Sequence, residues 1–527
     1  MRVALAQVES RVGGFARNLD RLVEAQAAAK SDGADVVVFP EMSLVGYPPR
    51  DLLFDQGFVA AAFEAAREAA RRTAGGPPCL VGGLARSTLR LPHHPSLANA
   101  ALLLSGGEIA HVQPKRLLPA YEVFHEPRWF VPGRESKAFE VAGRRVGALV
   151  CEDVWDEGYP AHPAADLAPQ GVEALLALVA SPFRVGIPPE RLRAARRHRL
   201  PIAFVNAVGA QDELIFDGGS FALSAEGEEL ARLPRFAEEV VTVDLDGANG
   251  PAFPGDEKET DAETELFAAL SFGVRGFVEG NGVSSVVLGL SGGVDSALVA
   301  AIAVEALGAS RVVAIHIPSR FTDPRSTVAA LEVASALGIR FEVRPLEPLL
   351  APFETMLADL VDAGPAGRRT HENLQARLRM TILAAFVNRY GGLLLNASNK
   401  TELALGYGTL WGDLAGLLAP IGDLPKTDVC RLARWVARTR GTIPPFVLER
   451  VPTAELSAGQ VDPFDYDDVA PRVEAIVGNR DGGDPANEAL RAAIRRAEGK
   501  RVVHGVVLKV SEWAFGSGRL VPVTRAY

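Results

Sequence analysis

Three residues in the first half of the chain together supply the chemistry of a thiol amidase. Each lies at or near the end of an apolar, strand-like run: Glu41 in VVVFPE, Lys115 in HVQPKRLLP and Cys151 in VGALVCED. A free cysteine is only slightly ionised at neutral pH, so its thiol needs activation before it attacks an amide. A carboxylate can take the thiol proton, and an ammonium can stabilise the thiolate and the tetrahedral oxyanion. The trio therefore predicts hydrolysis of a carbon–nitrogen bond without a catalytic histidine.

A glycine-rich turn in the second half has the chemistry of a pyrophosphate site. The hexapeptide SGGVDS begins at Ser291, between the strand-like VVLGL and the helical ALVAAIAVEAL. Gly292 and Gly293 let the backbone turn tightly and approach a ligand, and the start of the following helix attracts anions. Ser291 and Ser296 can donate hydroxyls, while Asp295 is placed to hold Mg²⁺ beside phosphates. No lysine follows the glycines, so the turn is not the loop of γ-phosphate-transferring enzymes.

The first half resembles the carbon–nitrogen hydrolase (nitrilase) superfamily over residues 1–245. The resemblance is carried by FPEMSLVGYPPRDLL, KRLLPAYEVFHEPRWFVPG and ALVCEDVWDEG, and it is strongest to the branch that is fused to NAD synthetases. It implies that Glu41 is the general base, that Lys115 orients the substrate and stabilises the oxyanion, and that Cys151 is the nucleophile.

The same resemblance assigns further residues around this trio. It implies that Glu126 is a supporting catalytic glutamate and that Tyr121 and Ser181 hold a glutamine substrate. At position 187, where related domains often have lysine, this chain has Ile187, and Arg184 is the alternative cation that we consider for the glutamine contact.

The second half resembles the pyrophosphatase-loop (PP-loop) enzymes, which cleave ATP to AMP and pyrophosphate while they adenylylate an acid. The stretch 394–436, LLNASNKTELALGYGTLWGDLAGLLAPIGDLPKTDVCRLARWV, resembles the second signature of the NAD synthetase family, and HENLQARLRM (371–380) resembles its dinucleotide contact. Together the two halves resemble the glutamine-dependent NAD synthetase family. This resemblance implies ATP and Mg²⁺ as cofactors, and glutamine and deamido-NAD (nicotinate adenine dinucleotide) as further substrates.

The resemblance also assigns site residues in the second half. Asp295 and Glu402 would bind Mg²⁺, and Lys426 would neutralise phosphate charge in the transition state. The residues that would contact ATP are Gly289, Leu290, Ser291, Gly292, Gly293, Val294, Asp295, Ser296, Ala397, Lys426 and Thr453. The residues that would contact deamido-NAD are Asn373, Arg377, Glu402, Asp413 and Lys500. Two places depart from the family pattern: Ala397 replaces a common threonine, and 502–504 replace a segment where relatives often show Gln and prolines.

Short apolar runs alternate with helical patterns along the whole chain, which predicts an α/β protein. The strand-like runs of the first half are 2–8, 34–41, 79–85, 145–153, 173–181 and 201–209. With the resemblance, they predict a nitrilase-like αββα sandwich at 1–247. Residues 248–263, rich in Gly, Pro and acids, are the expected linker. Residues 264–527 begin with a βαβαβ pattern and should form a doubly wound parallel sheet, of the adenine-nucleotide α-hydrolase-like (PP-loop) type by resemblance.

The bulk composition excludes several classes of protein. The chain has 527 residues, 48% of them hydrophobic, and a formal net charge of −10. Nucleic-acid binding needs a basic surface and is not expected, and no apolar run is long enough to cross a membrane. The three cysteines, Cys79, Cys151 and Cys430, are too scattered for a disulfide framework, so we expect a cytoplasmic protein. Members of the resembled family pair their synthetase domains, and we expect a homo-oligomer.

These residues predict an enzyme with two linked reactions. Cys151 releases ammonia from glutamine, ATP adenylylates the nicotinate carboxylate of deamido-NAD, and ammonia displaces AMP to give NAD. Three alternatives stay open: a PP-loop amidotransferase for a different acid, a ligand-sensing regulator with weakened catalysis, and a synthetase that uses mainly free ammonia. Ile187 and Ala397 suggest weakened function, whereas the intact catalytic residues of both halves favour the glutamine-dependent enzyme.

Overall fold

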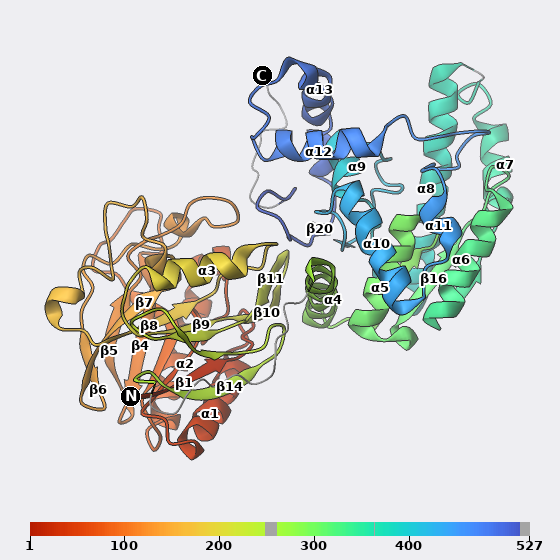
Figure 1. The fold of residues 1–527 in the computed structure, drawn as a ribbon. Coiled ribbons are helices and arrows are strands. Elements are labelled where there is room, and N and C mark those ends of the chain that lie inside the picture. Colours follow the sequence, from red (N-terminus) through yellow and green to blue (C-terminus); the bar gives the residue numbers. More distant parts are fainter. Residues whose placement is uncertain (248–260, 363, 517–527) are drawn as a thin grey trace. The chain divides into compact units, whose positions relative to one another are not determined.

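The chain forms two compact units. The computed structural model describes residues 1–247, 261–362 and 364–516, and contacts within the chain divide it into Met1–Thr260 and Asp261–Tyr527 (Figure 1). Residues 248–260 of the predicted linker lie outside the described residues, and its last two residues already belong to helix α4 (Ala262–Gly280). The exact domain boundaries stay a prediction.

Two six-stranded sheets form the centre of the first unit. In spatial order, one contains β14 (Glu239–Asp244), β1 (Arg2–Gln7), β2 (Val36–Val38), β3 (Cys79–Arg86), β4 (Leu97–Ser105) and β5 (Glu108–Pro114). The other contains β13 (Glu229–Arg232), β12 (Phe221–Leu223), β9 (Ile202–Asn206), β8 (Ala174–Val179), β7 (Arg144–Val150) and β6 (Phe139–Val141). The hairpin β10 (Val208–Gln211) and β11 (Leu214–Asp217) lies beside them.

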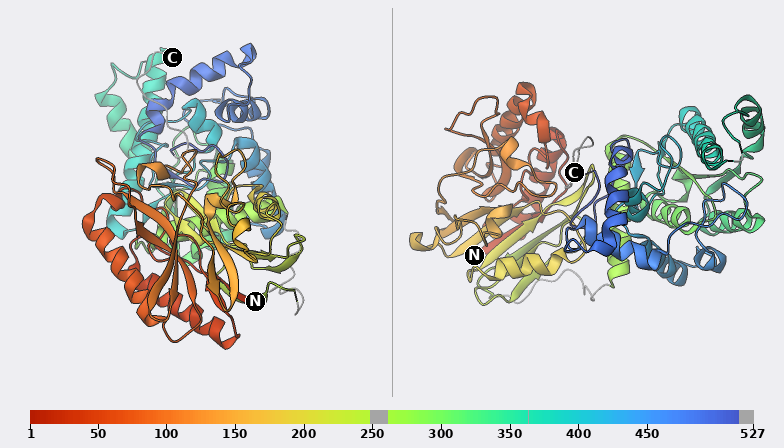
Figure 2. Two further views of the ribbon diagram at one scale, coloured as in Figure 1. Left: turned by 90° about the vertical axis from the view of Figure 1, so that its left-hand side faces the viewer. Right: turned by 90° about the horizontal axis from the view of Figure 1, so that it is seen from above.

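Helices cover the outer face of each sheet. Figure 2, in its right-hand view, shows the red helices α1 (Phe15–Ser31) and α2 (Gln56–Arg72) on one side of the paired sheets and the yellow α3 (Ile187–Arg196) on the other. Separate hydrophobic clusters join α1 and α2 to the first sheet, the two sheets to each other, and α3 to the second sheet. The layers are therefore helix, sheet, sheet and helix, and the predicted αββα sandwich is confirmed.

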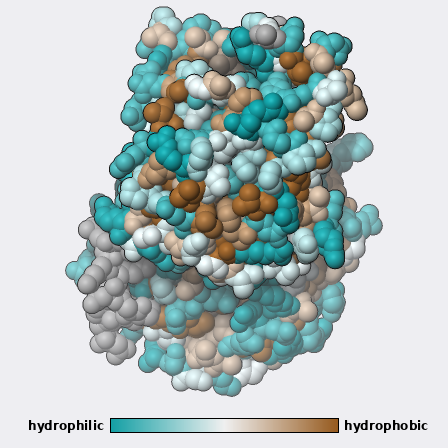
Figure 3. Space-filling model, turned by 90° about the vertical axis from the view of Figure 1, so that its right-hand side faces the viewer, coloured by the Kyte–Doolittle hydropathy of each residue, from teal (hydrophilic) through white to brown (hydrophobic). Residues whose placement is uncertain are grey.

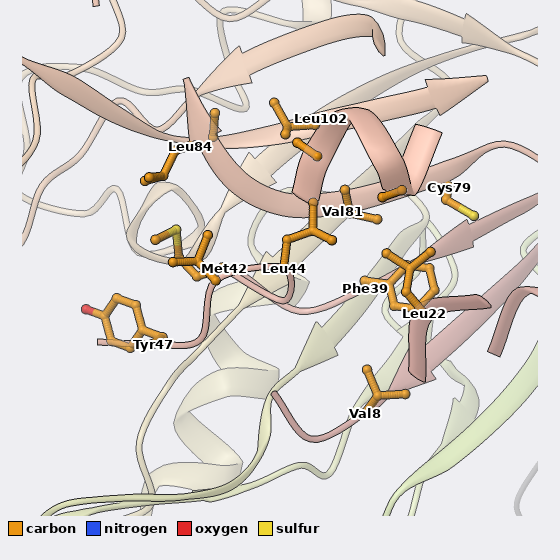
Figure 4. Close-up of a cluster of buried hydrophobic side chains, with 14 of the residues drawn as sticks. Val8, Leu22, Phe39, Met42, Leu44, Tyr47, Cys79, Val81, Leu84 and Leu102 are labelled. Carbon is orange, nitrogen blue, oxygen red and sulfur yellow. The ribbon is translucent and has the colours of Figure 1, made fainter. Parts of the chain in front are cut away.

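The central strands of this sandwich are largely apolar because each of their faces is buried; they are β1, β2, β7, β8 and β9. In β1, Val3 and Leu5 pack between the two sheets, whereas Ala4 and Ala6 face the helices. Figure 4 shows part of the helix-facing cluster, which includes Leu22 of α1. Such apolar runs leave polar side chains at or just after the strand ends, which is where Glu41, Cys151 and Ser181 stand.

The second unit contains a four-stranded parallel sheet. Its order is β17 (Arg340–Val343), β16 (Val312–His316), β15 (Val286–Gly289) and β18 (Leu393–Leu394). The strand that comes first in the chain thus lies between the second and the fourth, which is the doubly wound order predicted from the sequence. Ligands of such sheets bind beyond the carboxyl end of the strand where the order reverses. That strand is β15, so the glycine-rich turn follows it directly.

Helices bury both the sheet and the segments after it. The helix after β15, α5 (Val294–Leu307), is apolar on almost every face because α4 and α10 (Lys426–Arg440) pack against it. The long helix α8 (Pro365–Tyr390) packs on β15. Further along, α9 (Lys400–Leu405), α12 (Tyr466–Val477) and α13 (Glu488–Arg496) share a cluster with β20 (Val506–Val507). Among the described residues, no helix is both long and apolar enough to span a membrane.

Candidate active sites

Glu41, Lys115 and Glu126 form a buried charged cluster in the first unit. Lys115 Nζ donates to Glu41 Oε1 at 2.8 Å and to Glu126 Oε1 at 2.9 Å, and each of the three residues is 1% exposed. Asn99 Nδ2 also donates to Glu41 Oε1, at 2.6 Å, and the Tyr47 hydroxyl donates to Glu126 Oε1 at 2.9 Å. Two carboxylates around one ammonium keep a negative charge inside the protein, an arrangement that burial penalises and that is typical of catalytic sites.

Cys151 lies directly after β7, at the first residue of the short helix η3 (Cys151–Val154). Its φ is +45°, a left-handed conformation that is strained for a residue with a side chain and that is concentrated at functional sites. Asp153 ties this turn to the loop after Lys115, because its carboxylate accepts three backbone amides. They belong to Val150 (3.1 Å), Arg116 (3.0 Å) and Leu117 (2.9 Å). The predicted nucleophile and lysine are therefore held together by one side chain.

Burial decides how these groups are protonated. Burial, reinforced by the charge of Glu41, raises the pKa of the Cys151 thiol, and the opposing effects of Lys115 and the Ala180 backbone do not cancel the rise. The thiol is thus neutral at rest and needs a base. Burial also raises the pKa of Glu126 to about 7. Glu41 Oε2 is buried and has no hydrogen-bond partner within the described residues, so it is the oxygen that can accept the thiol proton.

The predicted glutamine-binding residues lie beside the Cys151 turn. The Tyr121 hydroxyl donates to both carboxylate oxygens of Glu152, at 3.1 and 3.0 Å, and Tyr159 donates to Oε1 at 2.8 Å. Burial raises the pKa of Glu152. Ser181 follows β8, the parallel neighbour of β7, so Ser181 and Cys151 meet at the same sheet edge. The carboxylate of Glu152 and the phenol of Tyr121 thus lie beside the Cys151 turn, and Ser181 lies at the end of the neighbouring strand.

The first turn of α3 contains Ile187, the residue that departs from the family pattern in this unit. Ile187 begins α3 and is buried, and Arg184 forms an ion pair with Glu190. The cation of α3 that contacts Ser181 is instead Arg191, whose Nε donates to Ser181 Oγ at 3.1 Å. Sequence reasoning did not single out Arg191.

The glycine-rich turn in the second unit folds over the start of α5. Gly292 has φ +86°, and a Cβ there would lie 2.3 Å from the carbonyl oxygen of Ser326, so the position requires glycine. The hydroxyl oxygens of Ser291 and Ser296 lie 3.1 Å apart, and Ser291 Oγ accepts the Gly293 amide at 3.2 Å. The turn and the helix start thus have a geometry that suits an anion, while the ATP contacts themselves stay a prediction.

Asp295, Glu402 and Lys426 meet beside this turn. Lys426 Nζ donates to Asp295 Oδ2, and Asn399 Nδ2 donates to the other oxygen at 3.0 Å. Asn399 also caps α9: its Oδ1 accepts the Glu402 amide at 3.1 Å, and Glu402 Oε2 accepts the Asn399 amide at 3.2 Å. One asparagine therefore fixes both acidic residues.

The two carboxylates fit a divalent cation. Burial raises the pKa of Glu402 to about 8, and the charge of Asp295 adds to the rise. A second positive charge beside them would relieve this repulsion, and Mg²⁺ prefers carboxylate oxygens. Within the described parts of the chain, no group of three or more His, Cys, Asp or Glu side chains is arranged to hold a metal. Mg²⁺ is usually bound by one or two carboxylates together with substrate phosphates, and the pair suits an ion held in that way.

Three predicted deamido-NAD residues contact one loop, 406–413, and a fourth, Asp413, is the last residue of that loop. Lys500 Nζ donates to the carbonyls of Gly406 and Gly408 at 2.7 and 2.6 Å, and Arg377 Nε donates to the carbonyl of Leu410 at 3.2 Å. Thr409 joins the other two: its hydroxyl donates to Asn373 Oδ1 at 2.7 Å, and its amide donates to Asp413 Oδ1 at 2.9 Å. Burial raises the pKa of Asp413 and lowers that of Lys500.

The remaining predicted ATP contacts, Thr453 and Ala397, differ in whether their side chains can form hydrogen bonds. The Thr453 hydroxyl donates to the carbonyl of Gln460 at 2.7 Å and accepts the amide of Glu455 at 3.2 Å. Glu455 in turn accepts from Ser326 Oγ at 2.7 Å, which links this loop to the glycine-rich turn. Ala397 contributes no polar side chain.

The comparisons with known proteins cover both units. A carbon–nitrogen hydrolase family model matches residues 2–250, and an NAD synthase model matches residues 266–480. A glutamine-dependent NAD(+) synthetase of Synechocystis sp. is 38% identical, over 100% of this chain and 99% of that protein. The chain belongs to the glutamine-dependent NAD(+) synthetase family. A family member from Thermotoga maritima is 36% identical, over 100% of this chain and 99% of its own length.

Solved structures of glutamine-dependent NAD(+) synthetases have the same fold. The structure of the Acinetobacter baumannii enzyme in complex with adenosine diphosphate covers 99% of this chain and 98% of its own, with a TM-score of 0.79 and 31% identity. A structure from Cytophaga hutchinsonii has a TM-score of 0.84 at 18% identity, over 100% of this chain and 98% of its own. The predicted combination of a nitrilase-like unit with a PP-loop synthetase unit is confirmed.

Four residues of this glutamine-dependent NAD(+) synthetase chain were missed by sequence reasoning: Asn99, Glu152, Arg191 and Asn399. Asn399 could have been found, because Asn followed three residues later by Glu is a helix-start pattern. Glu152 adjoins the nucleophile and is a polar residue at a strand end. Asn99 gives no local signal, since its partner Glu41 lies 58 residues away in the sequence. Arg191 is one of three arginines in α3, and only the fold shows that it is the buried one.

Proposed function

We propose that the chain makes NAD from deamido-NAD, with ammonia taken from glutamine and energy taken from ATP. One observation carries this proposal: a chain that matches glutamine-dependent NAD(+) synthetases along its full length contains both clusters intact. Amidation of a carboxylic acid needs a nitrogen source and an activated acid. The Glu–Lys–Cys cluster suits the first task, and the glycine-rich turn with its carboxylates suits the second.

In the glutaminase reaction we assign Cys151 as the nucleophile. Glu41 takes the thiol proton on Oε2 while its other oxygen stays bound to Lys115 and Asn99, and the sulphur bonds to the side-chain amide carbon of glutamine. Lys115 stabilises the negative tetrahedral oxygen, and Glu126 keeps that lysine in place. The carbon–nitrogen bond breaks as Glu41 returns the proton to the leaving ammonia. Water then hydrolyses the thioester and releases glutamate.

Three residues around the sulphur suit the amino-acid end of glutamine. A free glutamine carries an α-ammonium, for which the buried carboxylate of Glu152 is a strong acceptor. We assign Tyr121 and Ser181 as further contacts, since both lie beside the Cys151 turn. A substrate that brings its own ammonium would also compensate the charge of Glu152.

In the synthetase reaction, the turn at 289–296, with Ala397 and Thr453, is assigned to ATP. Asp295 and Glu402 would hold Mg²⁺, which supplies positive charge to the phosphates when bound. The nicotinate carboxylate attacks the α-phosphorus, pyrophosphate leaves, and Lys426 neutralises charge on the phosphate oxygens. Ammonia then attacks the acyl carbon of the adenylate and AMP leaves.

The dinucleotide is assigned to the residues around loop 406–413. Asn373, Arg377 and Lys500 bond to this loop, and Asp413 closes it by accepting the amide of Thr409. Glu402 lies at the start of the short helix that precedes the loop. The loop can therefore move several contacts together when the substrate binds. The segment 502–504, which departs from the family pattern, follows Lys500 and Arg501 and includes the exposed Val502 and Val503.

We also propose that the chain works as a homo-oligomer through its second unit. Helices α6 (Pro324–Leu337) and α7 (Glu347–Met356) expose large apolar side chains, and Figure 3 shows hydrophobic groups among polar ones on the face that carries these helices. The most exposed are Val328 at 55%, Leu331 at 52% and Met356 at 74%. Neighbouring exposed apolar groups mark protein interfaces. Light scattering of the purified chain should give at least a dimer, and a monomer would contradict this proposal.

The function is tested with the purified chain, two nitrogen donors and several acids. NAD and AMP should form from deamido-NAD and ATP with either glutamine or ammonium. A different carboxylic acid that supports AMP release in place of deamido-NAD would overturn the substrate assignment. Synthesis from ammonium alone, with no use of glutamine, would overturn the glutaminase assignment.

A further inference from the structure

Arg191 is a charged residue on the buried face of an otherwise apolar helix side. The buried residues of α3 are Ile187, Arg191, Ala194 and Ala195, which share one face of the helix. Arg191 is 2% exposed. Burying a charge is costly unless the charge is paired and hydrogen-bonded. A polar residue that breaks the apolar pattern in this way usually has a function.

The guanidinium of Arg191 divides its bonds between Asp217 and the segment after β8. Its two terminal nitrogens lie 3.0 and 2.8 Å from the oxygens of Asp217. Nε donates to Ser181 Oγ at 3.1 Å, and one terminal nitrogen donates to the carbonyl of Ser181 at 2.8 Å. It also lies 3.2 Å from the carbonyl of Pro182. Asp217 accepts a second cation, since Arg235 Nε donates to it at 3.0 Å.

These bonds use every hydrogen-bonding group of Ser181 except the proton of its hydroxyl. Its amide donates to Asn206 Oδ1 at 2.9 Å and its carbonyl accepts from Arg191. Its oxygen Oγ accepts from Arg191 Nε, so the hydroxyl proton must point elsewhere. Within the described residues, no hydrogen bond donated by this buried hydroxyl is found. The guanidinium of Arg191 lies directly behind this oxygen, and a cation at that position favours an anion in front of the hydroxyl.

We propose that Arg191 is a positioning residue that turns Ser181 into a hydrogen-bond donor for the α-carboxylate of glutamine, so that the site prefers a free amino acid to a simple amide. The inference rests on the proposed glutaminase function of Cys151. Glutamine has an acceptor where Ser181 offers its proton, and the guanidinium of Arg191 adds a favourable field at that point. An amide that lacks the carboxylate gains neither contribution.

The test compares two substrates in four variants. Glutamine and 4-aminobutanamide carry the same amide and ammonium, but only glutamine has the α-carboxylate. In Arg191→Met and in Ser181→Ala, kcat/KM for glutamine should fall by about 10- to 100-fold, mostly through KM, while hydrolysis of 4-aminobutanamide stays at the wild-type rate. Arg191→Lys should lose most of the preference, because an ammonium lacks the planar fork. Arg193→Met, which removes an exposed arginine from the same helix, should change neither substrate.

The double variant Ser181→Ala/Arg191→Met distinguishes positioning from a general structural role. If Arg191 acts through Ser181, the double variant should be no worse with glutamine than Ser181→Ala alone. Equal losses on both substrates, or fully additive losses with glutamine, would overturn the inference. Because Arg191→Met leaves Asp217 without its main partner, Arg191→Met/Asp217→Asn provides a second variant without that lone charge, and it should give the same substrate pattern. Failure of the unmodified chain to hydrolyse glutamine would instead overturn the proposed function itself.

Discussion

Replacing Lys115 with methionine should damage both the stability and the chemistry of the first unit. Methionine has a similar length but no charge, so Glu41 and Glu126 would share a buried site without their counterion. Removing one partner of a buried ion pair costs about 3–5 kcal/mol of folding free energy. Loss of an oxyanion-stabilising group lowers kcat by about 10²- to 10³-fold. Glutamine hydrolysis should therefore fall by at least that factor, whereas NAD formation from ammonium continues.

The stability loss should depend on pH in a defined direction. Burial already raises the pKa of Glu126 to about 7, and the charge of Lys115 lowers it from a still higher value. In the variant, the pKa of Glu126 therefore rises further above its unfolded value. A carboxylate whose folded pKa is raised contributes stability below its unfolded pKa and loses it as pH rises through the folded pKa. The deficit of the variant should be small at pH 5 and should grow between pH 7 and 9.

Urea unfolding at pH 5 and at pH 8 measures this difference. Pulse hydrogen exchange of the amides of β7 and β8 reports the first unit separately from the second. The matched control is Lys137→Met, which removes a lysine with a side chain 61% exposed and paired with Glu135, and such a pair is worth less than about 1 kcal/mol. Equal unfolding midpoints for Lys115→Met and the unmodified chain at both pH values would refute the reasoning.

Three further changes test the other groups. Glu402→Gln should stabilise the second unit above pH 8 in thermal scans, because ionisation of Glu402 costs stability as pH rises through its pKa of about 8. The same variant should reduce ammonium-dependent NAD formation, and unchanged activity would contradict the Mg²⁺ assignment. Gly292→Ala places a Cβ 2.3 Å from a carbonyl oxygen and should abolish AMP release. Gly308→Ala meets open space at φ +82° and ψ 151°, so it should cost only about 1–3 kcal/mol of backbone strain and keep AMP release. Glu152→Gln should raise KM for glutamine by about 10-fold, and an unchanged KM in the hydrolysis assay would exclude its role.

The sequence predicts the strands that carry the catalytic residues because these strands are buried on both faces. Glu41 and Cys151 follow runs with no polar residue, so a polar side chain at the end of such a run is a strong local signal. Strand β4, LANAALLLS, was not among the predicted strands. Its alanines and leucines favour a helix as much as a strand, and its pairing with β3 and β5 decides the outcome. Asn99, which holds the base, was missed for that reason.

Side-chain partners across long sequence distances could not be predicted. Lys115 bonds to Glu41 across 74 residues, and Lys426 bonds to Asp295 across 131. Composition and spacing supply the residue types, but only the packed sheets show which oxygen of Glu41 is occupied and which is left for the thiol. The protonation state of Cys151 could not be predicted from the sequence either. The sequence suggests an activated thiolate, whereas burial keeps a neutral thiol until the base acts.

The central claim is that one unit generates ammonia and the other consumes it. The most direct measurement is NAD formation by Cys151→Ala, with glutamine and with ammonium as alternative nitrogen donors. Synthesis from glutamine should disappear, because no nucleophile remains to release its amide nitrogen, and synthesis from ammonium should proceed at the rate of the unmodified chain. Loss of both activities, or continued use of glutamine, would contradict this division of labour.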